Sequence, residues 1–330
     1  MKKKIWVALV ALILTASVAG LPRYAVNATT AVGVLSYLPA SDAIMVVDVR
    51  RLLTQTVPKI FSGDLSRIAQ ANAEIEKFKA RTGIDPRSFD RVVIGTRFTY
   101  PSPKTTKLET VAIAQGAFNA KEIAASVRTA AGTGYREEKY HGATIMLVNI
   151  NDQMKVLGLW DMQVKELGVC VLDPNSLALG DLEKVRAAID AGKKGRANAE
   201  LAALATRDPN AVMGFGANIP RELLATLNVG NDTIAKDVNS IRQAYGSVGS
   251  TQTDVSVMLV ARTDSPESAQ NLSDTVTGLK QLGGFLVGQL KEPRKTLAQN
   301  ALDNLKITTR GVELEIRTQV AAASLASLIK

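Results

Sequence analysis

The stretch ASDAIMVVDVRRLLTQTV, residues 40–57, returns in altered form as DPNAVMGFGANIPRELLATL, residues 208–227. Each copy begins with an apolar run, which is typical of a β-strand, and continues into residues that favour a helix. Three apolar residues and, after a short insertion, one arginine keep their order in both copies: Ala43, Ile44, Met45 and Arg51 match Ala211, Val212, Met213 and Arg221. This similarity predicts a duplicated α+β module.

The rest of the chain supports the same order of elements in both copies. For the first copy we expect the strand 43–49, a helical stretch bent at Pro58, the helix 65–82 ended by Gly83, strands 91–98 and 108–118, the helix 120–131 capped by Asn119, and the hairpin 135–150 turned at His141-Gly142. For the second copy we expect the strand from 211, a helix 232–245, a strand 254–262, a long helix from Ser265, a hairpin 305–320 turned at Arg310-Gly311, and a short helix 321–329.

The first copy is longer because it holds the segment 151–195. Within it we expect irregular chain over 151–164, strands 166–172 and 177–179, and a helix capped by Asp181; a small helix, 198–206, follows it. The predicted fold is therefore α+β, with two related modules of mixed or antiparallel sheet and helices packed on the sheet. The predicted parts are a signal peptide at 1–28, a first module at 33–206 with the insertion 151–195, and a second module at 207–330.

The first residues have the pattern of a secretory signal peptide. Lys2, Lys3 and Lys4 precede the uncharged apolar run 5–18, which is shorter than the roughly 20 residues that a membrane-spanning helix needs. Small residues allow cleavage after Ala19 or after Ala28, and we favour the second site. An uncleaved membrane anchor is the alternative. The pattern predicts an exported protein, periplasmic or extracellular.

The charge of the whole chain overstates that of the expected mature protein. Four of the 40 Lys and Arg and none of the 31 Asp and Glu lie in 1–28, so its removal lowers the net charge from +9 to +5. The remaining basic residues form no long run, and aromatic residues make up 5% of the chain. Nucleic-acid binding favours clustered basic side chains with aromatic rings for stacking, so we expect no nucleic-acid partner.

Few residues have the pattern of a reaction centre. His141 is the single histidine, which excludes a two-histidine metal motif, and Glu138 precedes it by three residues in a predicted hairpin, where such an offset points the side chains to opposite faces. We expect the adjacent Glu137 and Glu138 to pair with Arg136 or Lys139. Cys170 lies in an apolar run and is interpreted as a buried hydrophobic residue. The sequence predicts no catalytic residue, no metal site and no cofactor.

Asp48, Arg50 and Arg51 are the only candidate site residues, and they are weak ones. A carboxylate at the end of a buried strand, beside two arginines, can bind a cation or a polar ligand. Alternatively, Asp48 pairs with an arginine or caps the following helix. Gly216 stands at the corresponding position of the second copy, so the module does not require an acid there.

The helix that begins at Ser265 carries an apolar stripe with spacings of three and four residues, formed by Ala269, Leu272, Val276, Leu279, Gly283, Leu286 and Leu290. Such a stripe can mark a coiled coil or a partner-binding helix. The Gly-Gly pair at 283–284 and the additional apolar Phe285 and Val287 argue against a coiled coil. We expect this helix to pack over a sheet.

Three segments resemble a group of exported bacterial proteins of unknown function. They are Leu38-Pro39-Ala40, the strand FDRVVIG at 89–95, and the helical segment Val185–Asp190. The resemblance covers most of the chain and implies an α+β fold in an envelope protein, without a known activity.

Taken together, the residues and the resemblance predict an exported protein of the cell envelope with a binding or structural role and no enzymatic one. The alternative is a hydrolase or ligand-binding enzyme whose site is assembled from distant residues. The expected partner is an envelope protein or ligand, and a further alternative is an envelope-assembly partner held by the helix from Ser265. We expect membrane contact, if any, only through an uncleaved signal segment.

Overall fold

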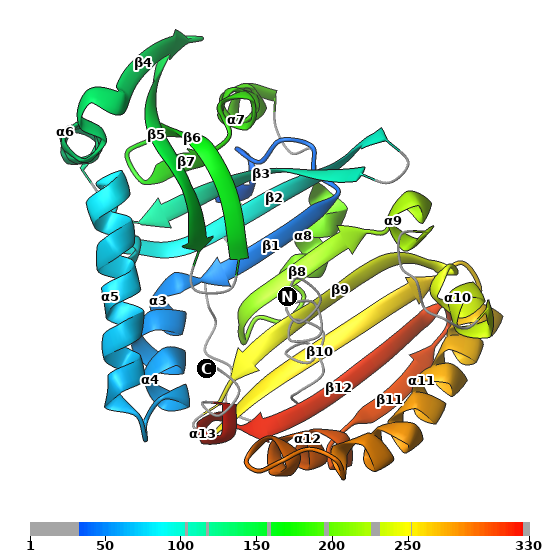
Figure 1. Ribbon diagram of the computed structural model, residues 1–330. Coiled ribbons are helices and arrows are strands. Elements are labelled where there is room, and N and C mark those ends of the chain that lie inside the picture. The colour runs from blue at the N-terminus through cyan, green and yellow to red at the C-terminus, as the bar shows by residue number, and fades with distance from the viewer. Residues whose placement is uncertain are drawn as a thin grey trace. The chain divides into compact units, whose positions relative to one another are not determined.

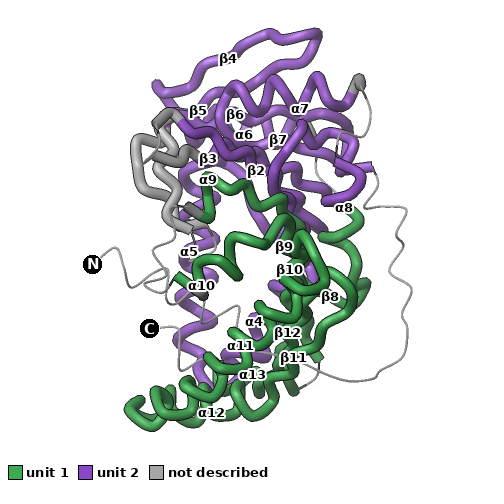
Figure 2. Tube along the Cα trace, turned by 90° about the vertical axis from the view of Figure 1, so that its right-hand side faces the viewer, with its two compact units in different colours: residues 1–24, 102–106, 203–330 green, residues 25–101, 107–202 purple. Residues whose placement is uncertain are grey.

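The computed structural model describes residues 33–102, 105–116, 119–156, 160–194, 198–225, 232–251 and 253–325. The predicted signal peptide lies outside these residues. The chain divides into two compact units, which are coloured separately in Figure 2. One comprises residues 25–101 and 107–202, and the other comprises 1–24, 102–106 and 203–330. We call the one with residues 25–101 and 107–202, purple in Figure 2, the first unit and the other, green, the second unit, in the order of their described sheets, and we describe each by itself.

The first unit is an antiparallel sheet with helices packed on it (Figure 1). Its strands follow one another across the sheet in the order β1-β2-β3-β7-β6-β5-β4. Their bounds are β1 Ala43–Asp48, β2 Phe89–Ser102, β3 Thr105–Gly116, β4 Tyr135–Tyr140, β5 Ala143–Val156, β6 Trp160–Asp173 and β7 Ser176–Gly180. Branched apolar side chains from successive strands fill the core, among them Ile44, Val93, Ile113 and Ile145, which are 1% exposed or less.

The helices of the first unit begin and end where the sequence places capping residues. A helical stretch after β1 comprises α3 Val49–Arg51, a π-helical turn Leu52–Thr56 and α4 Val57–Ile60. It is followed by α5 Leu65–Thr82, α6 Ala120–Ala131, α7 Leu182–Lys194 and α8 Ala199–Ala205. Gly83 ends α5 with φ +72° and Asn119 caps α6, so the predicted bounds of both helices are confirmed. Helix α6 packs against β5, and α7 packs against β5, β6 and β7.

Sequence reasoning was wrong about residues 151–164. Instead of irregular chain, β5 continues to Val156 and pairs with β6 from Trp160 onward, with a register shift between Asn149 and Asp152. The backbone hydrogen bonds of this hairpin come from cross-strand pairing, which polar residues support as well as apolar ones. The predicted insertion 151–195 thus supplies β6 and β7, which lie between β3 and β5 in the sheet.

The second unit is also an antiparallel sheet with helices, and its strand order is β11-β12-β10-β9-β8 (Figure 1). Here β10 pairs with β12 directly, because no strands are inserted between them. The strands are β8 Ala211–Asn218, β9 Ile241–Ser250, β10 Asp254–Thr263, β11 Lys306–Arg310 and β12 Glu313–Ala321. The helices are α9 Arg221–Ala225, α10 Asp232–Val238, α11 Pro266–Val287, α12 Arg294–Asp303 and α13 Ala322–Leu325. The duplication itself stays a prediction.

The predicted helix 232–245 is wrong in its second half, because Ile241–Ser250 forms β9. Strand β9 lies between β8 and β10, and close packing there requires glycine at 246. A Cβ at Gly246 would collide with the carbonyl oxygen of Met258 on β10 and crowd the ring of Phe215 on β8. The long-range pairing with two strands therefore prevails over local helical preference.

The fold class that the sequence predicts is confirmed: the structure is α+β, with antiparallel strands and helices packed on them. No helix of the described ranges is long and apolar enough to cross a membrane.

Candidate functional site

Asp48 caps a helix. It ends β1, and its Oδ1 accepts a hydrogen bond of 2.9 Å from the backbone N–H of Arg51. The side chain of Arg50 is exposed and forms an ion pair with Asp90 of β2. Asp48 thus binds the helix terminus, and Arg50 binds a neighbouring strand. The three candidates Asp48, Arg50 and Arg51 therefore do not form a ligand pocket around the carboxylate.

His141 lies in the turn of the β4–β5 hairpin, with φ +48°, and Gly142 follows with φ +87°. Its Nδ1 lies 2.8 Å from Oδ1 of Asp190 on α7, and the hydroxyl of Tyr140 donates to the other oxygen of Asp190 at 3.0 Å. These contacts join the hairpin to α7, and His141 therefore has a structural role in the first unit.

The two glutamates of β4 also form structural ion pairs, and their predicted partners were wrong. Glu137 pairs with Arg128 of α6, and Glu138 forms a two-pronged pair with Arg186 of α7. Both helices pack against the sheet, so arginines on them reach β4 more readily than the neighbours along the strand do. Hydrogen bonds from Tyr135 and then Arg128 hold the pKa of Glu137 below its usual value, and those from Arg186 do the same for Glu138.

Cys170 is fully buried in β6, as predicted. Burial raises the pKa of its thiol to about 11, so the reactive thiolate is scarce at neutral pH.

The first unit holds a small cavity of about 100 Å³ beside the Leu38-Pro39-Ala40 segment. Lys184 and Glu109 line it and form an ion pair at 2.5 Å. The segment itself is anchored by Asn198, whose amide nitrogen donates to the carbonyl oxygens of Leu38 and Pro39 and whose oxygen accepts from the N–H of Ser41. The motif that carries the resemblance thus has a packing role here.

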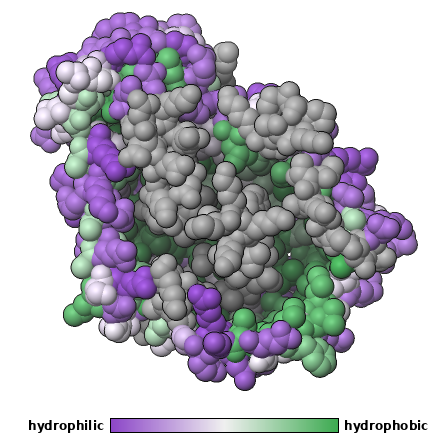
Figure 3. Space-filling view, viewed as in Figure 1, coloured by the Kyte–Doolittle hydropathy of each residue, from purple (hydrophilic) through white to green (hydrophobic). Residues whose placement is uncertain are grey.

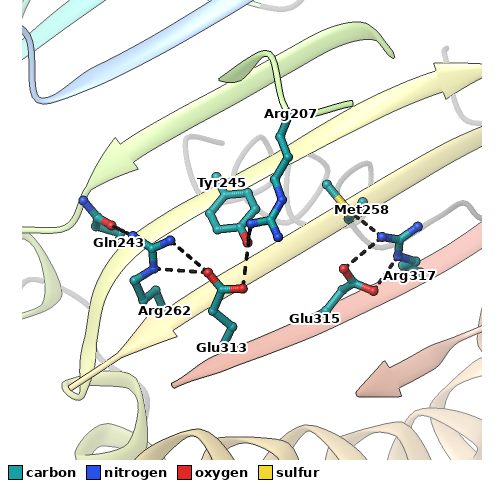
Figure 4. A network of polar contacts seen from close by, with 8 residues as sticks. All are labelled: Arg207, Gln243, Tyr245, Met258, Arg262, Glu313, Glu315 and Arg317. Carbon is teal, nitrogen blue, oxygen red and sulfur yellow. Dashed lines mark hydrogen bonds and ion pairs between the residues drawn. The ribbon is translucent and has the colours of Figure 1, made fainter. Parts of the chain in front are cut away.

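Figure 4 shows a polar network on one face of the second unit's sheet. Arg262 of β10 donates to Glu313 of β12 at 2.9 and 3.2 Å and to Gln243 of β9 at 2.6 Å. Tyr245 of β9 is 1% exposed, and its hydroxyl accepts a hydrogen bond from Arg207, whose guanidinium lies 5.0 Å from the ring centroid. The sequence does not indicate this network, because its residues come from strands that are far apart in the chain.

Both carboxylates of the network pair with arginines. Arg317 donates to both oxygens of Glu315, at 2.6 and 2.9 Å, which holds the pKa of Glu315 below its usual value. Burial, followed by the contact with Glu313, raises the pKa of Tyr245 to about 12. Glu315 therefore stays charged and the phenol of Tyr245 stays neutral near pH 7, as an ion-paired scaffold requires.

The most unusual surface lies at the C-terminal part of α11. The first part of its apolar stripe packs on the sheet as predicted, with Ala269 fully buried and Leu272 5% exposed. Beyond Val276 the stripe faces solvent instead. Five large apolar side chains are 42–80% exposed, and we call them the tip surface: Leu279, Leu282, Phe285, Leu286 and Leu290. Figure 3 shows apolar side chains at the lower right, over α11 and α12.

Helix α12 covers only one side of α11 at this point. The methyl groups of Leu302 on α12 lie 3.4 Å from where a Cβ on Gly283 would stand, and Val287 is 6% exposed. Next to this contact, a groove of about 520 Å³ opens between the two helices, lined by residues that include Lys280, Gln281 and Gln299. The tip surface therefore lies on a side of α11 that α12 leaves open.

Within the ranges that the structure describes, no group of three or more His, Cys, Asp or Glu side chains is placed to hold a metal ion.

Comparisons with known proteins give a similarity in structure alone. No family model matches the chain, and no curated protein does. Two solved structures that resemble it are crystal forms III and I of TP0453. The first has a TM-score of 0.45 and 12% sequence identity over 90% of this chain and 96% of that one, and the second has 0.44 and 13% over 90% and 95%. At this level, neither residue roles nor functions transfer.

Proposed function

We propose that this chain is a non-enzymatic binding protein of the cell envelope, and that it contacts its partner through the tip surface. The observation that carries the proposal is the exposure of five large apolar side chains, four on α11 and Leu290 just after it, up to 80% for Phe285. Contiguous apolar surface is costly to leave in water, and on folded proteins it marks sites of interaction. The helix from Ser265, which the sequence marks as a possible partner-binding element, is the one that carries it.

The paired state of the titratable groups supports a binding role over a catalytic one. A general acid or base needs a group free to exchange a proton near neutral pH. The carboxylates of the polar network instead accept hydrogen bonds from arginines: Glu313 from Arg262, and Glu315 from Arg317. For Glu315 this pairing lowers the pKa and favours the charged state.

The alternative function, a hydrolase with a site assembled from distant residues, has less support. The cavity beside Ser41 holds about 100 Å³, below the ~300–1,000 Å³ range of ordinary ligand pockets, and the groove of about 520 Å³ between α11 and α12 has, among the described residues, only Lys280 and Asp303 as charged lining residues. The Lys184–Glu109 pair at its wall is already formed.

The cell-envelope part of the proposal is supported by the basic, then apolar, pattern of residues 1–28.

Site-specific photocrosslinking in an envelope extract tests the proposal. A photoreactive phenylalanine analogue replaces Leu282 in one variant and Leu65 in a matched one; Leu65 is 78% exposed but lies on α5 of the first unit. We expect cross-linked products from position 282 that are absent from position 65. Equal products at both positions, or none at 282, would contradict the proposal.

A further inference from the structure

We infer that the tip surface docks on an anionic lipid surface, an inference that rests on the proposed function and names its partner. Two features of the same stretch of chain carry it: the arrangement of apolar side chains and the sign of the charges around them.

The apolar side chains form one continuous stripe. Leu279, Leu282 and Leu286 follow one another at intervals of three and four residues, so they lie along one side of α11, with Phe285 beside them, and Leu290 lies in the turn that follows the helix. Their exposed fractions are 47%, 59%, 64% and 42%, and that of Phe285 is 80%. The exposure is greatest near the end of α11, where the chain turns toward α12. A convex apolar ridge of this kind can enter the boundary between lipid headgroups and acyl chains.

The charges near this ridge are mainly positive. In the turn that follows Leu290, Lys291, Arg294 and Lys295 stand against the single acid Glu292, a net charge of +2, and Lys280 lines the groove between α11 and α12 together with Asp303. Lys291, Arg294 and Lys295 are exposed and follow directly after Leu290, in the turn and at the start of α12. Basic side chains near an apolar helix face are attracted to anionic headgroups, at about 1 kcal/mol per residue close to the surface.

A second copy of this chain fits the surface less well. Five side chains with these exposures present on the order of 500 Å², less than the ~800 Å² that each partner contributes to a standard protein interface. A symmetric contact through this patch would also place the +2 charge of one copy against that of the other. An anionic lipid surface supplies the opposite charge and needs no shape-complementary pocket.

This inference departs from the sequence-based expectation that the chain meets a membrane only through an uncleaved signal segment. Reversible attachment to a membrane commonly needs two signals, one apolar and one electrostatic. The tip surface and its basic neighbours supply both within one helical hairpin, whether or not residues 1–28 are removed.

Flotation of the exported form of the protein with lipid vesicles tests the inference. The probes are vesicles of phosphatidylcholine alone and vesicles with ~30% phosphatidylglycerol. We expect the protein to float with the anionic vesicles and to be released by ~0.5 M NaCl, because salt screens exposed charges. The double variant Phe285→Ser/Leu286→Ser should lower the vesicle-bound fraction at least tenfold, because it removes two apolar anchors. Both variant positions are exposed, so the fold is retained.

Two control variants, Leu65→Ser and Lys121→Glu, test whether changing any exposed leucine or lysine reduces membrane binding. Leu65→Ser removes another highly exposed leucine, and it should leave flotation unchanged. Lys291→Glu/Lys295→Glu should reduce flotation with anionic vesicles, whereas Lys121→Glu, at an exposed site on α6, should not. All variants keep residues 1–28 as the wild type has them, so a difference between them cannot come from that segment.

The outcomes separate the inference from the proposed function. Docking on anionic lipid is wrong if the wild type does not float. It is also wrong if the wild type floats equally with both kinds of vesicle and the Phe285→Ser/Leu286→Ser variant floats as well as the wild type does. If the crosslinker at position 282 then captures a protein that position 65 does not, the tip surface still binds and the proposed function survives with a protein partner. If neither flotation nor crosslinking depends on the tip surface, both the inference and the proposed function are wrong.

Discussion

Oδ1 of Asp48 accepts a hydrogen bond from the backbone N–H of Arg51 at 2.9 Å, and this contact starts the helical stretch that follows β1. The first turn of a helix has N–H groups without partners inside the helix, and a carboxylate at the cap satisfies one of them. The acid that the sequence singles out therefore stabilises a helix terminus.

Removing this cap should lower stability without affecting any binding. We expect Asp48→Ala to reduce the free energy of unfolding by about 1 kcal/mol and Asp48→Asn by a few tenths, because asparagine also caps. Urea unfolding measures both. Equal losses for the two variants would contradict the capping role.

Cys170 should be unreactive in the folded protein. It is fully buried, and burial raises its pKa to about 11, so at pH 8 a thiol reagent such as Ellman's reagent should react with it only after unfolding. One thiol per chain should then appear in denaturant. Rapid labelling of the native protein would show that the environment of β6 differs from that described above.

Gly83 should tolerate substitution far less than Gly311. Both have a positive φ, +72° and +58°, so alanine is strained at each by about 1 kcal/mol. A Cβ at Gly83 would in addition collide with the backbone of Ser126 on α6, whereas nothing lies within 4 Å at Gly311. We expect Gly83→Ala to cost at least ~3 kcal/mol and Gly311→Ala about 1 kcal/mol. Similar melting temperatures for the two variants would mean that α5 and α6 do not approach as closely as described.

The ion pair of Glu315 and Arg317 should make stability depend on pH. The hydrogen bond from Arg317 lowers the pKa of Glu315 in the folded state, so the pair stabilises the fold fully above the unfolded pKa of about 4.3 and loses this contribution as the pH falls through the folded value. Glu315→Gln should therefore lose ~0.5–1 kcal/mol at pH 7 and progressively less as the pH falls below the unfolded pKa of about 4.3. A loss that does not change with pH, measured by urea unfolding, would contradict this assignment.

The sequence predicts best where local chemistry decides. The bounds of α5 and α6 follow from Gly83 and Asn119, residues whose backbone preferences act within one helical turn. Strand β9 could not be predicted in this way, because its partners β8 and β10 bind it from both sides and override the helical preference of its residues.

The candidate site, too, can be predicted from the sequence only in part. The spacing of leucines on α11 predicts an apolar stripe, yet only the structure shows that its first part is buried and its last part exposed. The signal that could have indicated this was the widening of the apolar face at Phe285, beside the glycines 283–284. Whether a stripe finds a partner within its own chain depends on how far the sheet and α12 extend, and no local pattern encodes that.

Fluorescence from the tip surface in the presence of envelope membranes tests the central claim most directly. Leu282→Cys carries an environment-sensitive label such as NBD, and Lys121→Cys carries the same label as the control. The buried Cys170 stays unlabelled. If the tip surface is the contact site, adding the membranes should shift the emission of the label at 282 to shorter wavelength and increase it, while the label at 121 does not change. Unchanged emission at 282 would show that this surface stays in water and would contradict the account.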